Sequence, residues 1–382
     1  MKDLLESRNE IDQIDSEIVR LFERRMDVCK DVAEYKLHTG KPVLDRKREL
    51  DKIATLKEKA SNRFYSHGVE ELFEQIMAMS RKMQYKMLTE EGVNNDIGFD
   101  IVDSLPTDDI KVVYQGIPGA YSQQAATEYF KDKAEYVNVT TFREAMKWVR
   151  DGKANYAVLP MENSSAGIVT DVYDLLVEFS NCIVDTFDVK IEHCLCGIKG
   201  SKIEDIKDVY SHPQALMQSA KFLDAHRDWQ QISVANTAVA AKKVLEDQDQ
   251  RKAAICSEYA ARLYGLEILE EKINHNDNNS TRFIIVTNQK IFLKDASKIS
   301  ICFEVSHESG TLYHLLSHFI YNNLSMTKIE SRPVEGRTWE YRFFVDFEGN
   351  MADGAVKNAI RGLREESKSL KILGNYSSKE GV

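Results

Sequence analysis

The sequence lacks the features that several large classes of protein require. Acidic residues outnumber basic ones by 61 to 51, so the chain has no excess of the basic residues that non-specific nucleic-acid binding needs. No run of about 18 apolar residues is present, which excludes a membrane-spanning helix. The first residues, Met1 to Glu6, are mostly charged and have no signal-type apolar core. Six scattered cysteines are typical of reduced thiols. We therefore expect a cytoplasmic protein.

The net charge of -10 is concentrated in one short segment. With 382 residues, the chain is long enough for two or three domains. Residues 1–88 hold 18 Lys and Arg against 17 Asp and Glu, whereas residues 89–109 hold seven acids and no base. The second segment is also rich in turn residues, so the pattern predicts an acidic linker between two domains.

The N-terminal region, residues 1–88, has the pattern of an all-α module. Residues 3–38 contain no Pro or Gly, and their apolar side chains recur every three or four positions. Gly40 and Pro42 end this helix, and Asp45 opens a second one. A third helix is predicted over about 68–88. The stripe of the first helix consists of Ile11, Ile14, Ile18, Leu21, Val28 and Val32.

Polar side chains interrupt the apolar faces of these helices. Arg25 occupies a stripe position of the first helix, and Ser80 interrupts the stripe of the third helix, with Gln84 one turn beyond it. A guanidinium at the edge of a stripe can also reach solvent along its methylene groups, and pattern alone leaves both readings open for Arg25. Buried polar groups need hydrogen-bond partners, so several of them together suggest a binding site.

Residues 1–88 resemble the all-helical chorismate mutase domain. The likeness lies in eight positions with matching residue types over three helices. They are Arg8, Arg25, Lys36, Asp45, Arg48, Glu49, Ser80 and Gln84. On pattern alone, Asp45, Arg48 and Glu49 would be an ordinary surface cluster of charges.

The resemblance implies an intramolecular rearrangement of chorismate to prephenate that uses no cofactor and no metal. A site for this reaction holds a dicarboxylate in a reactive conformation and stabilises charge on the ether oxygen. Arg25 with Ser80, and Arg8 with Lys36, would hold the two carboxylates. Lys36 and Gln84 would face the ether oxygen, and Glu49 with the backbone near Asp45 would bind the hydroxyl. Arg48 would support them.

Helix geometry adds an expectation about oligomeric state. At about 1.5 Å per residue, Arg8 and Arg25 lie roughly 25 Å apart along one straight helix. The two cannot grip one small substrate. If Arg8 belongs to the site, it must come from a second chain, so we expect at least a homodimer with shared active sites.

Short apolar runs alternate with helical stretches in the central region, which predicts an α/β fold with largely parallel sheets. The first run, Lys111–Gln115, is followed by a glycine loop at Gly116–Gly119 that lacks the full dinucleotide or phosphate-loop pattern. The run His193–Cys196 could suggest a metal, but its spacing is not that of a zinc site and core packing explains it better. Five further strands are expected, at Tyr156–Leu159, Cys182–Val184, Cys194–Ile198, Ala253–Cys256 and Phe283–Val286.

The central region resembles prephenate dehydratase over about residues 110–287. The likeness lies in Gly119–Ser122, Glu162–Asn163, Ser211–Gln214 and Thr281–Phe283. The family has two α/β lobes with the site in the cleft between them. We expect a domain over 110–290, with one lobe at 110–187 plus 268–287 and the other lobe between these segments.

The implied reaction removes water and carbon dioxide from prephenate to give phenylpyruvate. Aromatisation drives it, so the protein must assist a departing hydroxide and recognise carboxylates. The resemblance points to Thr281, which would hydrogen-bond the leaving oxygen. Glu162 could act as an acid only if burial raised its pKa. The remaining prephenate-binding residues carried over are Asn163, Ser211, Gln218, Arg282 and Phe283.

From residue 297 to 376 the pattern is strand, helix, strand, strand, helix, strand, the order of a ferredoxin-like α+β fold. Length and order resemble an ACT domain, a common amino-acid sensor. Glu330, Ser331, Arg332 and Pro333 match one family signature. The other signature, Gly-Ala-Leu-Val, is here Gly310, Thr311, Leu312 and Tyr313, so its second and fourth positions depart. The resemblance implies L-phenylalanine as an allosteric inhibitor, and a simple dimerisation module is the alternative.

Taken together, the three modules are similar in kind and order to the bifunctional chorismate mutase/prephenate dehydratases. The family implies feedback-regulated phenylalanine biosynthesis, with chorismate and prephenate as substrates and neither nucleic acid nor membrane as partner. A non-enzymatic, two-lobed ligand-binding or amino-acid-sensing protein is the alternative. The reactive residue types at Arg25, Lys36, Gln84 and Thr281 argue against it.

Overall fold

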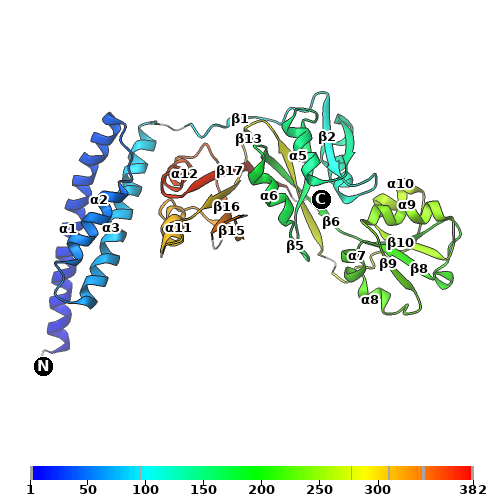
Figure 1. The fold of residues 1–382 in the computed structure, drawn as a ribbon, viewed down its shortest axis with the longest axis horizontal. Helices are drawn as coiled ribbons and strands as arrows, with labels where there is room; N and C mark the ends of the chain where they lie inside the picture. Colours follow the sequence, from blue (N-terminus) through cyan, green and yellow to red (C-terminus); the bar gives the residue numbers. More distant parts are fainter. Residues whose placement is uncertain are drawn as a thin grey trace. The chain divides into compact units, whose positions relative to one another are not determined.

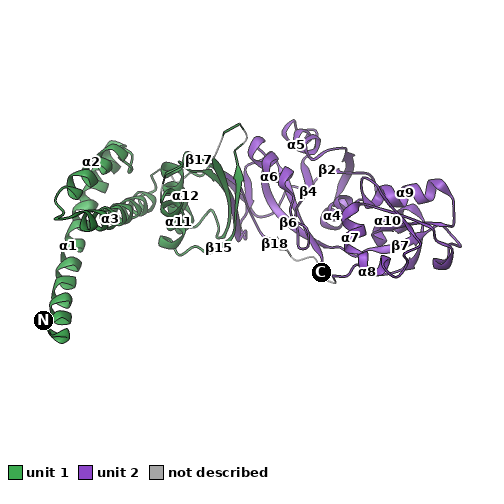
Figure 2. Ribbon diagram, turned by 60° about the horizontal axis from the view of Figure 1, so that its bottom comes forward, with its two compact units in different colours: residues 1–97, 301–371 green, residues 98–300, 372–382 purple. Residues whose placement is uncertain are grey.

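The computed structural model describes residues 3–93, 96–276, 278–308, 310–334, 336–337 and 340–379 (Figure 1). The chain divides into two units. The first comprises residues 1–97 and 301–371, and the second comprises residues 98–300 and 372–382 (Figure 2). Within the first unit, the N-terminal helices pack with a segment that follows the whole α/β region. No helix of the described residues combines the length and the apolar character needed to cross a membrane.

The N-terminal region is all-α, as predicted. Its helices are α1 (Leu4–Thr39), α2 (Arg46–Lys57) and α3 (Arg63–Glu90). Gly40 ends α1 with a left-handed backbone (φ 67°), and its N–H donates to the Lys36 carbonyl over 2.8 Å. Asn62 caps α3, since its side chain accepts a hydrogen bond from the Tyr65 N–H at 2.9 Å. This cap explains why α3 begins at Arg63, earlier than the predicted position near 68.

Helix α1 leaves its apolar stripe uncovered within the single chain. Ile11, Ile14, Ile18, Leu21 and Val28 are each between 51% and 57% exposed. Over the whole helix, only Ala33 is fully buried. The stripe predicted from the sequence is therefore present, but it has no packing partner within the described part of this chain.

The second unit contains two large sheets, besides a short two-stranded pair. In the first sheet, β2 and β3 are parallel, β2 and β4 are parallel, and β12 lies antiparallel between β4 and β6. The order is β6-β12-β4-β2-β3, with helices α4 (Tyr121–Phe130), α5 (Phe142–Arg150) and α6 (Thr170–Glu178) in the connections. The strand bounds are β2 (Ile110–Gln115), β3 (Ala134–Val139), β4 (Tyr156–Asn163), β6 (Cys182–Lys190) and β12 (Ser280–Thr287).

The second sheet has the order β11-β7-β10-β8-β9. Its strands are β7 (Cys194–Gly197), β8 (Asp208–Ser211), β9 (Gln230–Ser233), β10 (Lys252–Cys256) and β11 (Glu267–Glu270). Its helices are α7 (Pro213–Gln218), α8 (Ala220–Leu223), α9 (Thr237–Asp247) and α10 (Glu258–Tyr264). Strands β8, β9 and β10 are parallel, whereas β7 is antiparallel to both β10 and β11. The sheets are thus mixed, and β11 lies in the second lobe although the expected boundary at 268 cuts through it.

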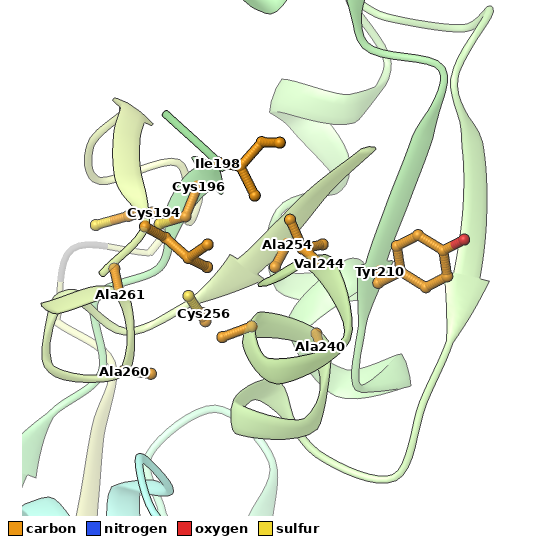
Figure 3. Packing of buried hydrophobic residues seen from close by; sticks show 12 residues of the cluster. Cys194, Cys196, Ile198, Tyr210, Ala240, Val244, Ala254, Cys256, Ala260 and Ala261 are labelled. Atoms are coloured by element: carbon orange, nitrogen blue, oxygen red, sulfur yellow. The ribbon is translucent and has the colours of Figure 1, made fainter. Parts of the chain in front are cut away.

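The two cysteines of the His193–Cys196 run lie in the core of the second lobe (Figure 3). Cys194 and Cys196 are 4% and 0% exposed and pack with Cys256, whereas Leu195 points into the other core of the lobe. Burial raises the pKa of Cys194 to about 11. No cluster of three or more His, Cys, Asp or Glu side chains able to hold a metal occurs in the described part of the chain.

The region predicted as an acidic linker contains the end of α3 and a short strand, β1 (Asp100–Val102). This strand pairs in parallel with β13 (Ile291–Leu293). Beyond β13 the strand–helix–strand–strand–helix–strand order is as predicted. Its elements are β14 (Lys298–Glu304), α11 (Thr311–Tyr321), β15 (Met326–Pro333), β16 (Tyr341–Glu348), α12 (Gly354–Glu366) and β17 (Ser369–Tyr376), with the strand order β15-β16-β14-β17.

Candidate active sites

Arg25 and Ser80 join α1 to α3. The Arg25 guanidinium Nη1 donates a hydrogen bond to the Ser80 hydroxyl over 2.7 Å, and Ser80 itself is only 4% exposed. The Ser80 hydroxyl donates in turn to the Ile76 carbonyl at 2.8 Å. The stripe-breaking arginine therefore turns inward to a buried partner and does not reach out to solvent.

Gln84 lies one turn beyond Ser80 and is 6% exposed. Its Nε2 donates to the Ser80 carbonyl at 3.2 Å, while its Oε1 is buried with no hydrogen-bond partner among the described residues. A buried amide oxygen without a hydrogen-bond partner costs free energy. The Gln84 amide is therefore held at one end only, and this position suits a polar ligand.

Lys36 lies near the end of α1, and its Nζ donates to the Val43 carbonyl over 2.6 Å. Burial lowers the pKa of Lys36, against the opposing charges of Asp45, Glu365 and Glu49. Lys36 also lines a cavity of about 600 Å³. The other charged residues of this cavity are Lys41, Lys357, Arg361 and Arg364 against Asp96 and Glu365. Positive charge prevails there, which favours an anionic ligand.

The three predicted residues at the start of α2 have different environments. Asp45 caps the helix, since its Oδ1 accepts from the Arg48 N–H at 3.1 Å, and both residues line an exposed hollow. Glu49 is partly buried, and its Oε2 accepts from Nη1 of Arg81 at 2.5 Å. Arg8 is exposed near the start of α1. Hydrogen bonds therefore bring together Arg25, Ser80 and Gln84, but none among the described residues connects Arg8 to them.

A second candidate site lies between the two lobes of the second unit. It is a cavity of about 410 Å³ whose walls come from both sheets. Four of the predicted residues line it, namely Asn163, Gln218, Thr281 and Phe283. The loop at Gly116–Ser122 and the His212–Gln214 turn also contribute, so the cavity lies where the sequence motifs converge.

Thr281 is 9% exposed on β12 and has a well-defined partner. Nδ2 of Asn163, on the neighbouring strand β4, donates to the Thr281 hydroxyl oxygen over 2.9 Å. The same amide group lies within 2.9 Å of Asn279 Oδ1 and 3.2 Å of the Ser280 carbonyl. Because Asn163 donates to it, the Thr281 hydroxyl can donate its own hydrogen into the cavity.

Three predicted residues do not line the cavity. Arg282 makes a two-pronged contact to Asp188, with distances of 2.9 and 2.8 Å, and this hydrogen bonding raises its pKa. Glu162 pairs with Arg282 across the β4–β12 ladder. The fully buried Ser211 hydroxyl donates to the Ile255 carbonyl at 2.6 Å. These residues contact neighbouring strands, which suits a supporting role.

His193 and Tyr121 line this cavity but were not among the predicted site residues, although Tyr121 belongs to the Gly119–Ser122 motif. His193, only 2% exposed, has Nε2 3.0 Å from Gln218 Oε1 and Nδ1 3.2 Å from the Tyr121 hydroxyl. Burial lowers the pKa of His193, which favours the neutral ring. The tyrosine hydroxyl also donates to the Glu192 carbonyl. The available signal was the place of His193 between two predicted strands, where the chain passes from one lobe to the other.

The predicted effector residues lie on two elements of the C-terminal region. Gly310 has a left-handed backbone (φ 79°) and precedes α11, whose first residues are Thr311, Leu312 and Tyr313. The Tyr313 side chain is 56% exposed. Glu330, Ser331, Arg332 and Pro333 form the end of β15, paired with β16.

Comparisons with known proteins match the N-terminal helices and the α/β region to two enzyme families. The Chorismate mutase type II profile matches residues 7–85, and the Prephenate dehydratase profile matches residues 112–291. The bifunctional chorismate mutase/prephenate dehydratase of Aquifex aeolicus is 34% identical over 98% of this chain and 98% of the relative. The bifunctional chorismate mutase/prephenate dehydratase of Escherichia coli K12 is 30% identical over 99% of this chain and 97% of the relative. The prephenate dehydratase of Arthrobacter aurescens, in complex with L-Phe, has a TM-score of 0.66 and 28% identity over 72% of this chain and 92% of its own.

The folds and the two matched profiles define an enzyme that joins an isomerase to a carbon–oxygen lyase. The chain belongs to the bifunctional chorismate mutase/prephenate dehydratase family. It rearranges chorismate to prephenate and converts prephenate to phenylpyruvate, in phenylalanine biosynthesis. The prediction of a bifunctional enzyme is therefore confirmed, and the alternative of a non-enzymatic ligand-binding protein is not supported.

Proposed function

We propose that the two reactions occur at separate sites, the rearrangement among the N-terminal helices and the dehydration in the cavity between the lobes. The corresponding domains are residues 1–88 and 110–290, joined by the acidic segment 89–109. Each site has one observation that supports it most strongly. In the helices it is the contact of Arg25 with the buried Ser80, beside the buried Gln84 amide. Between the lobes it is the Thr281 hydroxyl fixed by Asn163.

At the first site, Arg25 and Ser80 bind one carboxylate of chorismate, and Lys36 with Arg8 of a second copy binds the other. The ether C–O bond breaks as the new C–C bond forms, so negative charge grows on the ether oxygen. The Lys36 ammonium and the Gln84 amide stabilise this charge once the amide turns its Nε2 towards the substrate. Glu49 and the backbone near Asp45 hold the hydroxyl, with Arg48 in support.

At the second site, the carboxylate on the ring of prephenate leaves as carbon dioxide, and the electron pair of that bond aromatises the ring. The hydroxyl opposite departs as hydroxide and takes up a proton to become water. Thr281 donates its hydrogen bond to this oxygen, because Asn163 already occupies the lone-pair side of the Thr281 hydroxyl. Gln218 and Phe283 contact the substrate from the walls of the cavity, with Glu162, Ser211 and Arg282 supporting them.

The test is a Thr281→Ala variant supplied with chorismate. Removing one donor to a developing oxyanion costs about 100- to 1,000-fold in rate. We expect phenylpyruvate formation to fall by at least about 100-fold while prephenate accumulates at the wild-type rate, with Thr281→Ser partly restoring turnover. Near-normal phenylpyruvate formation by the alanine variant would refute the role of Thr281.

We also propose that residues 297–376 form an ACT domain that binds L-phenylalanine. The β15-β16-β14-β17 order supports this assignment, since it is the strand order of a ferredoxin-like fold. The complex of the Arthrobacter aurescens prephenate dehydratase with L-Phe supports the choice of effector. The effector residues are Gly310–Tyr313 and Glu330–Pro333. The test is the dehydratase rate against added L-phenylalanine, and a flat response without calorimetric binding would favour a plain dimerisation module.

A homodimer is the smallest assembly that completes the first site. The exposed stripe of α1 supports it, because five large apolar side chains on one helix face are more than half exposed in the single chain. A second α1 packed antiparallel would cover this stripe and bring its own Arg8 towards Arg25. We also propose a cytoplasmic location, which the few and scattered cysteines of the sequence support.

A further inference from the structure

Arg81 follows Ser80 on α3 and is the centre of a buried charge cluster, and it is not itself among the predicted mutase residues. Its guanidinium donates through Nη1 to Glu49 at 2.5 Å, and through Nε and Nη2 to Glu366 at 2.8 and 3.4 Å. Arg81 is only 8% exposed. Glu49 belongs to α2, whereas Glu366 is the last residue of α12. One side chain therefore bridges the N-terminal helices and the C-terminal region of the first unit.

The cluster is held from both sides. Nζ of Lys82, the next residue on α3, donates to the Ser317 hydroxyl of α11 at 2.6 Å, and the Tyr85 hydroxyl donates to Glu365 at 3.2 Å. His318 Nε2 lies 3.3 Å from Glu366 Oε1, a distance that fits an ion pair when the ring is protonated. Helix α3 is thus fixed against α11 and α12, and Glu366 cannot move away from Arg81 without breaking these contacts.

The electrostatics fit a permanently charged pair. Burial alone would raise the pKa of Glu366, but His318 and Arg81 lower it to about 2. The carboxylates of Glu366 and Glu49 raise the pKa of Arg81 against the effect of its burial. A buried guanidinium needs such partners, because an unpaired buried charge is strongly unfavourable.

Packing alone does not fix Glu49. A hollow of about 170 Å³ lies beside it, lined also by Leu50, Glu74 and His314, together with Arg81 and Glu366. The Glu49 side chain is 26% exposed and has room to turn. Its contact to Arg81 is therefore the interaction that sets its direction.

We propose that Arg81 is a positioning residue for the mutase reaction: it orients Glu49, and Glu366 of the C-terminal region holds Arg81 in the orientation that does so. The mutase site then depends on a residue that lies 285 positions from Arg81 in the sequence. This inference rests on the proposed role of Glu49 in binding the chorismate hydroxyl. That hydroxyl does not react, so losing its partner should raise KM more than it lowers kcat.

The experiment uses the full-length enzyme and the double variant Arg81→Met/Glu366→Leu. Replacing both members of a buried ion pair by apolar side chains usually preserves stability, whereas removing one member does not. We expect a melting temperature close to wild type, unchanged dehydration of prephenate, and a KM for chorismate raised about 10- to 100-fold. Arg81→Lys should give a smaller rise, because one ammonium cannot bridge two carboxylates as a guanidinium does.

Three further variants complete the test. Lys86→Met, on the same helix in an exposed pair with Glu90, is the matched control and should leave the KM unchanged. Glu49→Gln should raise the KM, and adding it to the double variant should raise it little further, since both act through one group. An unchanged KM in the double variant, beside a raised one in Glu49→Gln, would overturn the inference alone. An unchanged KM in Glu49→Gln would overturn the proposed role of Glu49 and the inference with it.

Discussion

At the scale of single residues, the polar wall of the dehydratase cavity depends on a chain of buried hydrogen bonds. His193 connects the Gln218 amide to the Tyr121 hydroxyl, and each of the three side chains lines the cavity. A neutral imidazole has one N–H and one acceptor nitrogen, so it can orient both neighbours at once. His193 therefore fixes the orientation of the Gln218 amide, which we propose contacts the substrate.

Replacing His193 by Leu tests this role. Leucine has a similar volume but no ring nitrogen, so the Gln218 amide loses its partner, at a cost of about 1–3 kcal/mol for a buried polar group. We expect the KM for prephenate to rise about tenfold or more, with the chorismate reaction unchanged. Cys194→Ala is the control, because the neighbouring Cys194 points into the core. An unchanged KM for prephenate in His193→Leu would show that the Gln218 amide keeps its orientation without His193.

The lowered pKa of Glu366 predicts that the stability of the enzyme depends on pH. Its pKa in the folded chain is lowered to about 2, whereas the ordinary value is 4.5. A lowered carboxyl pKa stabilises the folded state above the ordinary value, and this stabilisation disappears as the pH falls towards 2. We expect wild type to melt well above Glu366→Gln near pH 6, and the two melting temperatures to converge between about pH 4.5 and 2. A constant difference over this range would contradict the assignment.

How far single residues can be predicted depends on where their partners lie. Arg25 interrupts an apolar stripe, and this pattern left open whether its charge faces inward or reaches solvent; the contact to Ser80 decides for the inward direction. Arg81 broke no such pattern, since its partner Glu366 comes from a helix near the other end of the chain. Arg282 is the opposite case. A sequence motif identified it as a site residue, but its guanidinium is hydrogen-bonded to Asp188 and does not line the cavity.

At the scale of elements, α11 and α12 approach closely because Gly362 has no side chain. A Cβ at this position would lie 2.2 Å from Cε1 of His318, and His318 itself is 1% exposed. We expect Gly362→Ala to destabilise the enzyme by about 1–3 kcal/mol through overpacking, measured by chemical denaturation.

Gly354 is the matched control for Gly362. It opens the same helix, and nothing lies within 4 Å of a Cβ built on it. Gly354→Ala should be neutral or slightly stabilising, because alanine restricts the unfolded chain. Equal effects of the two substitutions would mean that helix propensity, and not the contact with His318, governs the change.

Elements with strong local signals were predicted well, and elements that depend on distant pairing were not. The absence of Pro and Gly correctly predicted α1, and the apolar runs correctly predicted β2, β4, β6, β7, β10 and β12. Strand β9 was missed because its residues, Gln230–Ser233, are polar except for Ile232 and largely exposed at a sheet edge. The antiparallel insertion of β12 between β4 and β6 could not be inferred, since pairing partners leave no local pattern.

At the scale of the whole molecule, the proposed sharing of Arg8 predicts complementation between chains. Arg8→Ala and Arg25→Ala homodimers should each lose most mutase activity. A heterodimer of the two has one site with both substitutions and one site with neither, so mixing should restore up to half of the wild-type mutase activity per heterodimer. Dehydratase activity serves as the internal control. No recovery in purified heterodimers would exclude a shared site.

The position of β12 in its sheet has a consequence for biosynthesis of the enzyme. The second lobe, residues 194–270, is inserted between β6 and β12, so the first sheet remains open until β12 leaves the ribosome. The nascent chain must therefore keep the gap between β4 and β6 free of other strands while an entire lobe is translated. Thr281 enters the cavity only with β12, so the cavity between the lobes is complete only after both lobes have been made.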